Sequence, residues 1–335
     1  MRTRRVAATG VELTQLGFGS SAIGNMYRAV DDNTAQAALE AAWDAGIRYF
    51  DTAPYYGLGV AEQRLGRFLT GRPRQEFVVS SKVGRLLEPS HHPTARGDTI
   101  FDVPGDMRPV RDYSRDGVLR SIEATMQRTG LDRFDVILVH DPDDHWRQAV
   151  DEAMPTLTDL RDQGVIGAIG VGMNQSGMLE RFLRETAADV VMLAGRYTLL
   201  EQGALNDVLP AAAELGKSVI IAGAFNSGLL AQERPEADAK YDYLDAPSDV
   251  VERARRLADI CQEHATTLPA AAIAFPLGHP SVINVVLGMG APEEVTRNAT
   301  MYADTVPAEL WEHLRAEDLL HPDAPTPHET LTPRG

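Results

Sequence analysis

Three ionisable residues each end a short apolar run in the first half of the chain. The runs read RYFD, VVSSK and VILVH, and they end in Asp51, Lys82 and His140. A solvated strand end is the simpler explanation for any one of them, but three in succession indicate a shared site. Tyr56 follows Asp51 closely in the segment DTAPYYG, and from that loop it can reach the same place.

These four groups suit proton transfer at a carbonyl or an alcohol. A free phenol has a pKa of about 10, which is too high for efficient acid–base work near neutrality. A neighbouring ammonium stabilises phenolate, so we expect Lys82 to lower the pKa of Tyr56. Asp51 would neutralise and orient the lysine, and His140 would hydrogen-bond the substrate oxygen. The sequence shows no nucleophile–base elbow and no metal triad, and we predict no metal site.

Two further patterns imitate functional motifs. Residues 17–22 read GFGSSA, like the G-x-G-x-x-A dinucleotide fingerprint, but that fingerprint needs a helix to open directly on its glycines. Here the helical pattern begins only near Asn33, so we do not favour a Rossmann fold. Residues 140–145 read HDPDDH, and a solvated loop is the better interpretation because successive loop residues seldom converge on one metal.

The elements that must position these groups alternate along the chain. Short apolar runs, typical of strands buried on both faces, are followed by amphipathic helical segments. The first helix would be capped by Asn33 or Thr34. The runs predicted as strands are Leu16–Gly19, Arg48–Asp51, Phe77–Lys82, Val136–His140, Ala168–Val171, Val190–Leu193, Ser218–Ala222 and Val282–Leu287.

Alternation of this kind predicts a parallel sheet, and eight repeats favour a closed (β/α)8 TIM barrel of about 250 residues. An open doubly wound sheet is the alternative. We predict a single domain over residues 1–335 and assign the surplus length to four segments. Residues 1–14 would form a hairpin cap that turns at Thr9-Gly10, and residues 307–335 a tail. Residues 84–113 and 225–249 would be long loops at the C-terminal mouth, where barrel active sites form.

Composition excludes several classes of function. The 335 residues carry a formal net charge of −16, which disfavours nucleic acid as a partner. No apolar run approaches the ~20 residues that span a bilayer. The single cysteine, Cys261, cannot form an internal disulfide, which indicates a reducing compartment. We therefore expect a cytoplasmic protein that acts on a small molecule; the sequence does not set its oligomeric state.

The motifs together resemble those of the aldo-keto reductases. The segments are DTAPYYG with GVAE after it, SSKVG, LVHDPD and a glycine-rich fifth strand, in register from about Leu16 to Ala303. The resemblance implies a nicotinamide-dependent barrel, and its spacing selects Tyr56 over the neighbouring Tyr55. The catalytic tetrad that it implies is Asp51, Tyr56, Lys82 and His140.

The resemblance is less complete at the positions that bind the cofactor in the family. The fifth strand ends GVGMN, without the family's serine, so Asn174 is the expected carboxamide contact. The sixth strand lacks the family's glutamine, and Tyr197 is expected to line the site. The tyrosine that stacks on nicotinamide is replaced by Ala222 or Gly223. The residues expected to bind NAD, with NADP possible, are Asn174, Tyr197, Phe225, Asn226, Ser227, Gly228, Gly288, Met289, Gly290, Glu294 and Asn298.

NAD is preferred in this prediction because the turn 288–294 has no basic residue, and Arg297 is the first to follow. A closer resemblance, which includes the insertion 84–113, is to aldose 1-dehydrogenases that oxidise ring-form sugars such as L-fucose at the anomeric carbon. The same subgroup oxidises pyridoxal, another cyclic hemiacetal. The expected substrate contacts are Arg85, His145 and Trp146, with Asn226 on the same rim.

Other functions stay open. A general aldehyde or ketone reductase would use the same chemistry. A non-catalytic subunit that binds nicotinamide nucleotide would have no use for the Lys82–Tyr56 pair. A lyase or isomerase of sugar phosphates would need basic support near the last strands, where the sequence reads GMGAPEE.

Overall fold

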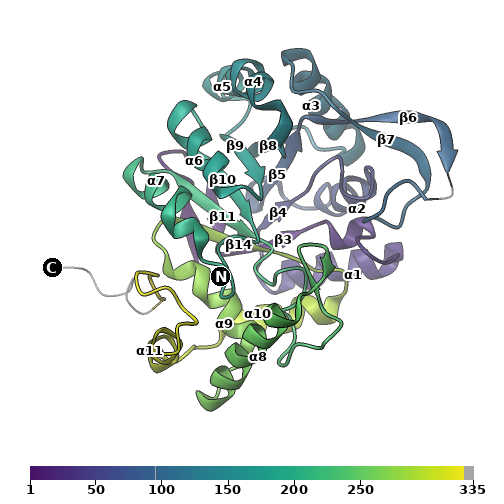
Figure 1. The fold of residues 1–335 in the computed structure, drawn as a ribbon. Coiled ribbons are helices and arrows are strands. Elements are labelled where there is room, and N and C mark those ends of the chain that lie inside the picture. The colour runs from purple at the N-terminus through teal and green to yellow at the C-terminus, as the bar shows by residue number, and fades with distance from the viewer. Residues whose placement is uncertain (95, 328–335) are drawn as a thin grey trace.

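The computed structural model describes residues 1–94 and 96–327, and their parallel strands close into a barrel. Helices surround it on the outside (Figure 1). Around the barrel each strand pairs with the next in chain order, and β14 closes it against β3. The barrel strands are β3 (Leu16–Gly19), β4 (Tyr49–Asp51), β5 (Val78–Val83), β8 (Val136–His140), β9 (Ala168–Met173), β10 (Val190–Ala194), β11 (Ser218–Ala222) and β14 (Val282–Gly288). The predicted TIM barrel and all eight strand positions are confirmed.

The barrel is packed from both sides, which explains why its strands read as continuous apolar runs. Residues such as Tyr49, Leu138 and Ile220 fill the interior, whereas a larger apolar layer lies between strands and helices. Tyr49 fits inside because Gly17 faces it without a side chain: a Cβ at Gly17 would lie 2.7 Å from Cδ1 of the tyrosine. The close approach therefore requires glycine on β3.

The outer helices follow the strands as expected, with small differences at their ends. Helix α1 begins at Asp32, before the expected caps, because Asp31 caps it: the Thr34 backbone N–H donates to Asp31 Oδ1 at 3.0 Å. The expected caps, Asn33 and Thr34, lie inside the helix. The helical segment after β8 contains a π-helical turn, Ala149–Ala153. The helices of this layer are α1 (Asp32–Asp44), α2 (Val60–Leu69), α3 (Arg115–Thr129), α4 (Trp146–Gln148), α5 (Met154–Asp162), α6 (Ser176–Glu185), α7 (Val208–Glu214), α8 (Ser248–Glu263), α9 (Leu268–Ala274) and α10 (Pro292–Ala303).

A hairpin of β1 (Thr3–Arg5) and β2 (Glu12–Thr14) lies at the N-terminal end of the barrel, where Val6 and Leu13 pack against the interior residues. Thr9-Gly10 lie in the loop that joins the two strands, as expected, but the tight turn within this loop comes earlier. Thr9 N–H donates to the Val6 carbonyl at 3.0 Å and Ala7 has a positive φ of 42°, so the chain reverses earlier. The Thr9 hydroxyl also donates to that carbonyl, at 2.7 Å, which stabilises the earlier turn.

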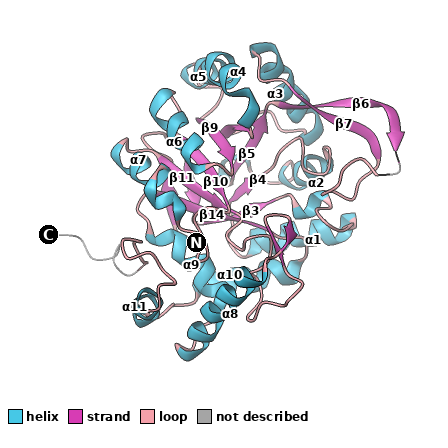
Figure 2. Ribbon diagram, in the orientation of Figure 1, coloured by secondary structure: helices cyan, strands magenta, loops and turns pink. Residues whose placement is uncertain are grey.

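Two insertions extend from the C-terminal side, after the third and seventh barrel strands. The first is a long hairpin of β6 (Arg85–Thr94) and β7 (Gly105–Arg111) that projects beyond the helices (Figures 1 and 2). The second carries the short hairpin of β12 (Lys240–Tyr241) and β13 (Leu244–Asp245). Both positions agree with the expected loops at the mouth.

The segment expected as a tail is partly a packed helix. Helix α11 (Ala308–Ala316) buries Trp311, whose ring centre lies 6.2 Å from that of Phe275. Residues 328–335 of the predicted tail lie outside the described part of the chain. Among the described residues, no helix is both long and apolar enough to cross a membrane.

Candidate active site

A cavity of about 860 Å³ opens at the C-terminal ends of the barrel strands. All four tetrad residues line it. Asp51 and His140 are the last residues of β4 and β8, Lys82 lies next to the end of β5, and Tyr56 comes from the loop after β4. The strands thus bring together groups that are far apart in the sequence, as expected for a site at a barrel mouth.

Lys82 and Asp51 form a buried ion pair. The Lys82 ammonium lies 2.9 and 2.7 Å from the two carboxylate oxygens and donates to the Thr52 carbonyl at 3.1 Å. The side chains are only 2% and 3% exposed. Ser80 donates a further hydrogen bond to Asp51 Oδ1 at 2.7 Å. This network fixes both charges, because a buried charge without its partner would be very costly.

Tyr56 lies against this pair, with the Lys82 ammonium 4.7 Å from the centre of its ring. Burial raises the pKa of Tyr56 well above its ordinary value, and the Asp51 carboxylate adds to the rise. The expected lowering by Lys82 is therefore wrong for this structure. Its positive charge is matched by Asp51, while desolvation disfavours the phenolate. The phenol keeps its proton at neutral pH.

The neighbouring Tyr55 is held by contacts with the β6–β7 insertion. Its hydroxyl donates to Asp98 Oδ2 at 2.8 Å, and its ring lies edge-on to Phe101 at 5.3 Å. Burial and the Asp98 carboxylate raise the pKa of Tyr55 above its ordinary value. Both tyrosines line the cavity, but Tyr56 is the one beside Lys82. The geometry supports Tyr56 as the proton-transfer residue.

His140 is a neutral imidazole. Burial lowers its pKa well below the usual value, and the positive charges of Arg85 and Lys82 contribute. Its ring lies perpendicular to that of Tyr56, with the centres 5.8 Å apart. A neutral imidazole beside the phenol can donate a hydrogen bond to a substrate oxygen without carrying a charge of its own.

The cavity has features that suit a nicotinamide nucleotide. Asn298 is buried against it, and Oδ1 of this residue has no hydrogen-bond partner within the described residues. Glycines at several lining positions leave the backbone open to a large ligand. Of the predicted cofactor contacts, those that line the cavity are Asn174, Phe225, Ser227, Gly228, Gly288, Glu294 and Asn298. These residues would hold the nucleotide, which supplies or accepts the hydride when bound.

Four predicted cofactor contacts do not line the cavity. Tyr197 is fully buried against Phe275, at a ring distance of 5.0 Å, and Met289 is part of the outer core. Asn226 is also buried, and its amide donates to the Gly195 carbonyl at 3.2 Å. Gly290 donates its backbone N–H to Glu294 Oε2 at 2.7 Å. Packing or local hydrogen bonds hold these residues away from the cavity, although the Tyr197 hydroxyl and Asn226 Oδ1 have no hydrogen-bond partner within the described residues.

Only one of the three side chains predicted to contact the substrate lines the cavity. Arg85 lines the cavity, whereas His145 and Trp146 do not. Trp146 packs on helix α6, where its ring lies 4.5 Å from that of Phe182 and under the Arg181 guanidinium. The His145 ring lies 5.1 Å from that of Tyr113. Both follow the strand end, but the short helical turns there direct them outward.

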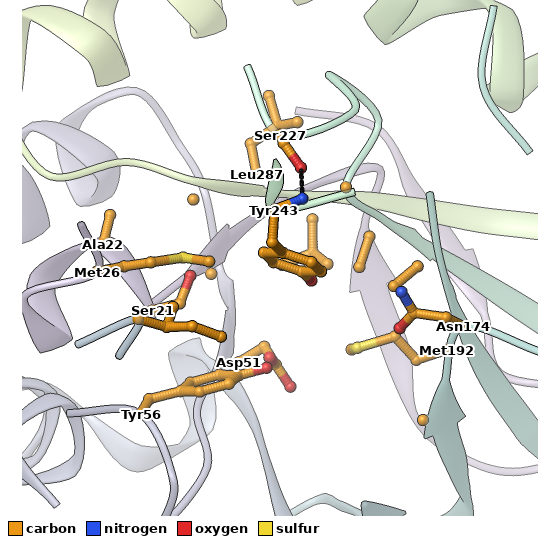
Figure 3. A pocket seen from close by; sticks show the side chains of 18 of the residues that line it. Ser21, Ala22, Met26, Asp51, Tyr56, Asn174, Met192, Ser227, Tyr243 and Leu287 are labelled. Carbon is orange, nitrogen blue, oxygen red and sulfur yellow. Dashed lines mark hydrogen bonds between the residues drawn. The ribbon is translucent and has the colours of Figure 1, made fainter. Parts of the chain in front are cut away.

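The sequence interpretation missed Tyr243, whose ring lies in the middle of the cavity in Figure 3, between Met26 and Asn174. It stands at the turn of the β12–β13 hairpin, and its backbone N–H donates to Ser227 Oγ at 3.1 Å. Partial burial and the Asp141 carboxylate raise the pKa of Tyr243. An aromatic group therefore lines the cavity despite the absence of a strand-end tyrosine on β11. Only its place in an insertion rich in tyrosine and aspartate could have pointed to it.

The barrel, the buried Lys–Asp pair and the adjacent tyrosine and histidine define an oxidoreductase of the nicotinamide-dependent barrel class. The chain belongs to the aldo/keto reductase family, whose model matches residues 15–317. It is 47% identical to a D-threo-aldose 1-dehydrogenase from a Pseudomonas species, over 96% of this chain and 98% of that protein. It is 38% identical to a pyridoxal 4-dehydrogenase from Microbacterium luteolum, over 95% and 97%.

Solved structures agree on the fold. A glycerol dehydrogenase from Gluconobacter oxydans superposes with a TM-score of 0.76 at 23% identity, over 95% of this chain and 94% of the other. An aldo-keto reductase from Bacillus halodurans gives 0.74 at 22% identity, over 98% and 99%. The protein is thus an NAD(P)-dependent oxidoreductase with an aldo-keto reductase barrel.

Proposed function

We propose that the protein oxidises the anomeric hydroxyl of a free aldose in its ring form to the lactone, with NAD as the acceptor. The observation that carries the proposal is the 47% identity to a D-threo-aldose 1-dehydrogenase over almost the full length of both chains. The cavity supports it, because charged and hydrogen-bonding groups such as Arg85 and Asn174 line it alongside the tetrad. Such a lining suits a polyhydroxylated ring.

The chemistry removes one hydride and one proton from the sugar. A bound nicotinamide nucleotide would supply the hydride acceptor for the anomeric carbon. Tyr56 takes the proton of the anomeric hydroxyl as the carbonyl of the lactone forms. Tyr56 must first lose its own proton, which favours alkaline pH because its pKa is raised. Neutral His140 donates a hydrogen bond to the same oxygen. The Lys82–Asp51 ion pair holds both of its charges in fixed positions beside Tyr56.

The preference for NAD rests on the charge at the start of helix α10. Glu294 lines the cavity there, caps the Gly290 backbone N–H and pairs with Arg28 at 3.1 Å. The Glu294 carboxylate would repel a ribose 2′-phosphate. Arg28 is already paired with Glu294, so it is not free to bind that phosphate. Arg297 also lines the cavity and is the residue that would favour NADP.

Initial rates measured by the absorbance of reduced nicotinamide test the proposal. We expect L-fucose or D-arabinose with NAD to give the highest kcat/KM, and NADP to give a lower one. A higher kcat/KM for pyridoxal than for any aldose would overturn the sugar assignment. A higher kcat/KM with NADP would overturn the cofactor assignment alone.

Pyridoxal is the second candidate substrate, because the chain is 38% identical to a pyridoxal 4-dehydrogenase over nearly its full length. Pyridoxal is a cyclic hemiacetal, so the tetrad would act on it in the same way. In either case the proposed partner is a small molecule rather than a nucleic acid. The net charge of −16 disfavours a nucleic-acid partner, and the buried, single Cys261 fits the proposed cytoplasmic location.

A further inference from the structure

A second carboxylate lies beside the tetrad. Asp141 directly follows His140 and lines the cavity, and its Oδ2 is 3.6 Å from Nε2 of that histidine. The same carboxylate pairs with the Arg85 guanidinium, which comes from the base of the β6–β7 hairpin. These side chains are 27% and 13% exposed. The pair therefore faces the space in which a substrate must lie.

The backbone of Asp141 is held in an unusual conformation. Its φ is 43°, in the left-handed region that non-glycine residues rarely adopt. The Tyr113 hydroxyl bridges the carbonyl oxygens of His140 and Asp141, at 2.7 and 2.8 Å. The Tyr113 ring packs so closely on Gly84 that a Cβ there would lie 2.1 Å from its Cε1. Backbone strain that the surroundings enforce in this way is typical of functional sites.

Arg85 is fixed from the other side. Its guanidinium lies 4.5 Å above the centre of the Tyr55 ring, and Tyr55 is itself anchored to Asp98 of the same insertion. The Nε of Arg85 is buried and has no hydrogen-bond partner within the described residues. Both partners of the ion pair are thus preorganised and partly desolvated at the cavity wall. Burial raises the pKa of Asp141 because the carboxylate has lost hydrating water. Hydrogen-bond donors from a ligand would replace that water.

We propose that Asp141 determines specificity for the sugar: its carboxylate accepts hydrogen bonds from ring hydroxyls other than the anomeric one, and Arg85 holds it in place. Vicinal hydroxyls match a carboxylate, which accepts at two oxygens. The inference rests on the proposed aldose oxidation. It assigns a role to the insertion at the third strand, which supplies both Arg85 and Tyr113.

An alternative role would act through the histidine. If Asp141 only oriented or polarised His140, its loss would slow hydride transfer for every substrate, and kcat would fall. If it binds ring hydroxyls, the loss appears mainly in KM and only for hydroxylated rings. The two roles therefore differ in a measurable way.

The test is the Asp141→Asn variant, assayed with NAD and L-fucose. Asparagine tolerates positive φ and keeps the shape of the side chain, so the loop conformation should survive. We expect KM for L-fucose to rise about 10- to 100-fold, the usual effect of losing hydrogen bonds to a charged group, with kcat within threefold. KM for tetrahydropyran-2-ol, a cyclic hemiacetal without further hydroxyls that would be oxidised in the same way, should stay unchanged.

The matched control is Asp144→Asn, the same change in the same loop. Asp144 does not line the cavity and its side chain is 84% exposed, so we expect wild-type kinetics. An unchanged KM in Asp141→Asn, or a fall in kcat alone, would overturn the inference while aldose oxidation stands. Equal weakening of L-fucose and tetrahydropyran-2-ol would also overturn it. A wild-type protein that oxidises no aldose overturns the proposed function, and this inference with it.

Discussion

The Lys82 ammonium directs its hydrogen bonds to Asp51 and to the Thr52 carbonyl, and it meets Tyr56 at the face of the ring, 4.7 Å from the centre. The lysine thus neutralises a carboxylate before it can stabilise a phenolate. Asp51 therefore sets how strongly the pair favours either protonation state of Tyr56. This relationship has a direct consequence for pH dependence.

We expect kcat/KM for aldose oxidation to rise with pH through the alkaline range. Oxidation needs the phenolate of Tyr56, and burial raises its pKa above the ordinary value of about 10. Carbonyl reduction needs the protonated phenol and should stay flat over the same range. The pKa of His140 is lowered, so no loss from its protonation should appear near neutrality. Profiles measured in both directions check this, and oxidation that declines above neutrality would contradict it.

Tyr56→Phe should reduce turnover about 100-fold or more, the scale of losing a general acid–base group. NAD binding, measured by fluorescence titration, should be unaffected because the ring remains. Tyr55→Phe is the matched control: it loses only the hydrogen bond to Asp98 and should keep most of the turnover. The opposite ranking of the two variants would show that the tyrosines have been assigned in the wrong order.

Lys82→Met should destabilise the fold by about 3–5 kcal/mol, because it leaves Asp51 buried without its counter-ion. Urea denaturation followed by circular dichroism measures the change in the free energy of unfolding. The double variant Lys82→Met/Asp51→Asn should recover most of that loss, since no buried charge is left unpaired. Both variants should be inactive. If the two substitutions lower the free energy of unfolding additively in the double variant, the ion pair itself contributes nothing to stability.

Glu294→Gln should shift the cofactor preference toward NADP by about tenfold, a change of roughly 1.4 kcal/mol in relative binding. The change removes a negative charge from the cavity and releases Arg28 for a phosphate. Glu293→Gln is the control, because Glu293 does not line the cavity. The ratio of kcat/KM for the two cofactors is the readout. A ratio that moves equally in both variants would indicate a general charge effect rather than a contact.

The sequence predicted the barrel well because strands buried on both faces leave a continuous apolar run, which local composition reveals. Asp51, Lys82 and His140 could be identified from the sequence for the same reason, since each lies at the end of such a run. Tyr197 and Met289 were misplaced because a residue near a strand end faces either the cavity or the helices, and motif letters do not say which. Their burial in the outer core shows the direction they take.

Asp141 and Tyr243 were missed for a different reason. Each depends on a positive φ, 43° and 66°, which directs the side chain in a way that no periodicity reports. Each is also held by a distant residue: Tyr113 fixes the first, and Ser227 the second. Long-range contacts between loops decide such positions, and they exist only once the barrel has formed.

The β6–β7 insertion leaves the barrel and returns to it at nearly the same point. Asp112 N–H donates to the Gly84 carbonyl at 3.1 Å, which closes the root of the hairpin. Arg85 and Tyr113 sit at this root, and the segment between them carries Asp98, the anchor for Tyr55. The insertion is therefore structurally self-contained: its two ends are joined to each other, and Arg85 lies in the same segment as the Asp98 anchor of Tyr55, whose ring holds it.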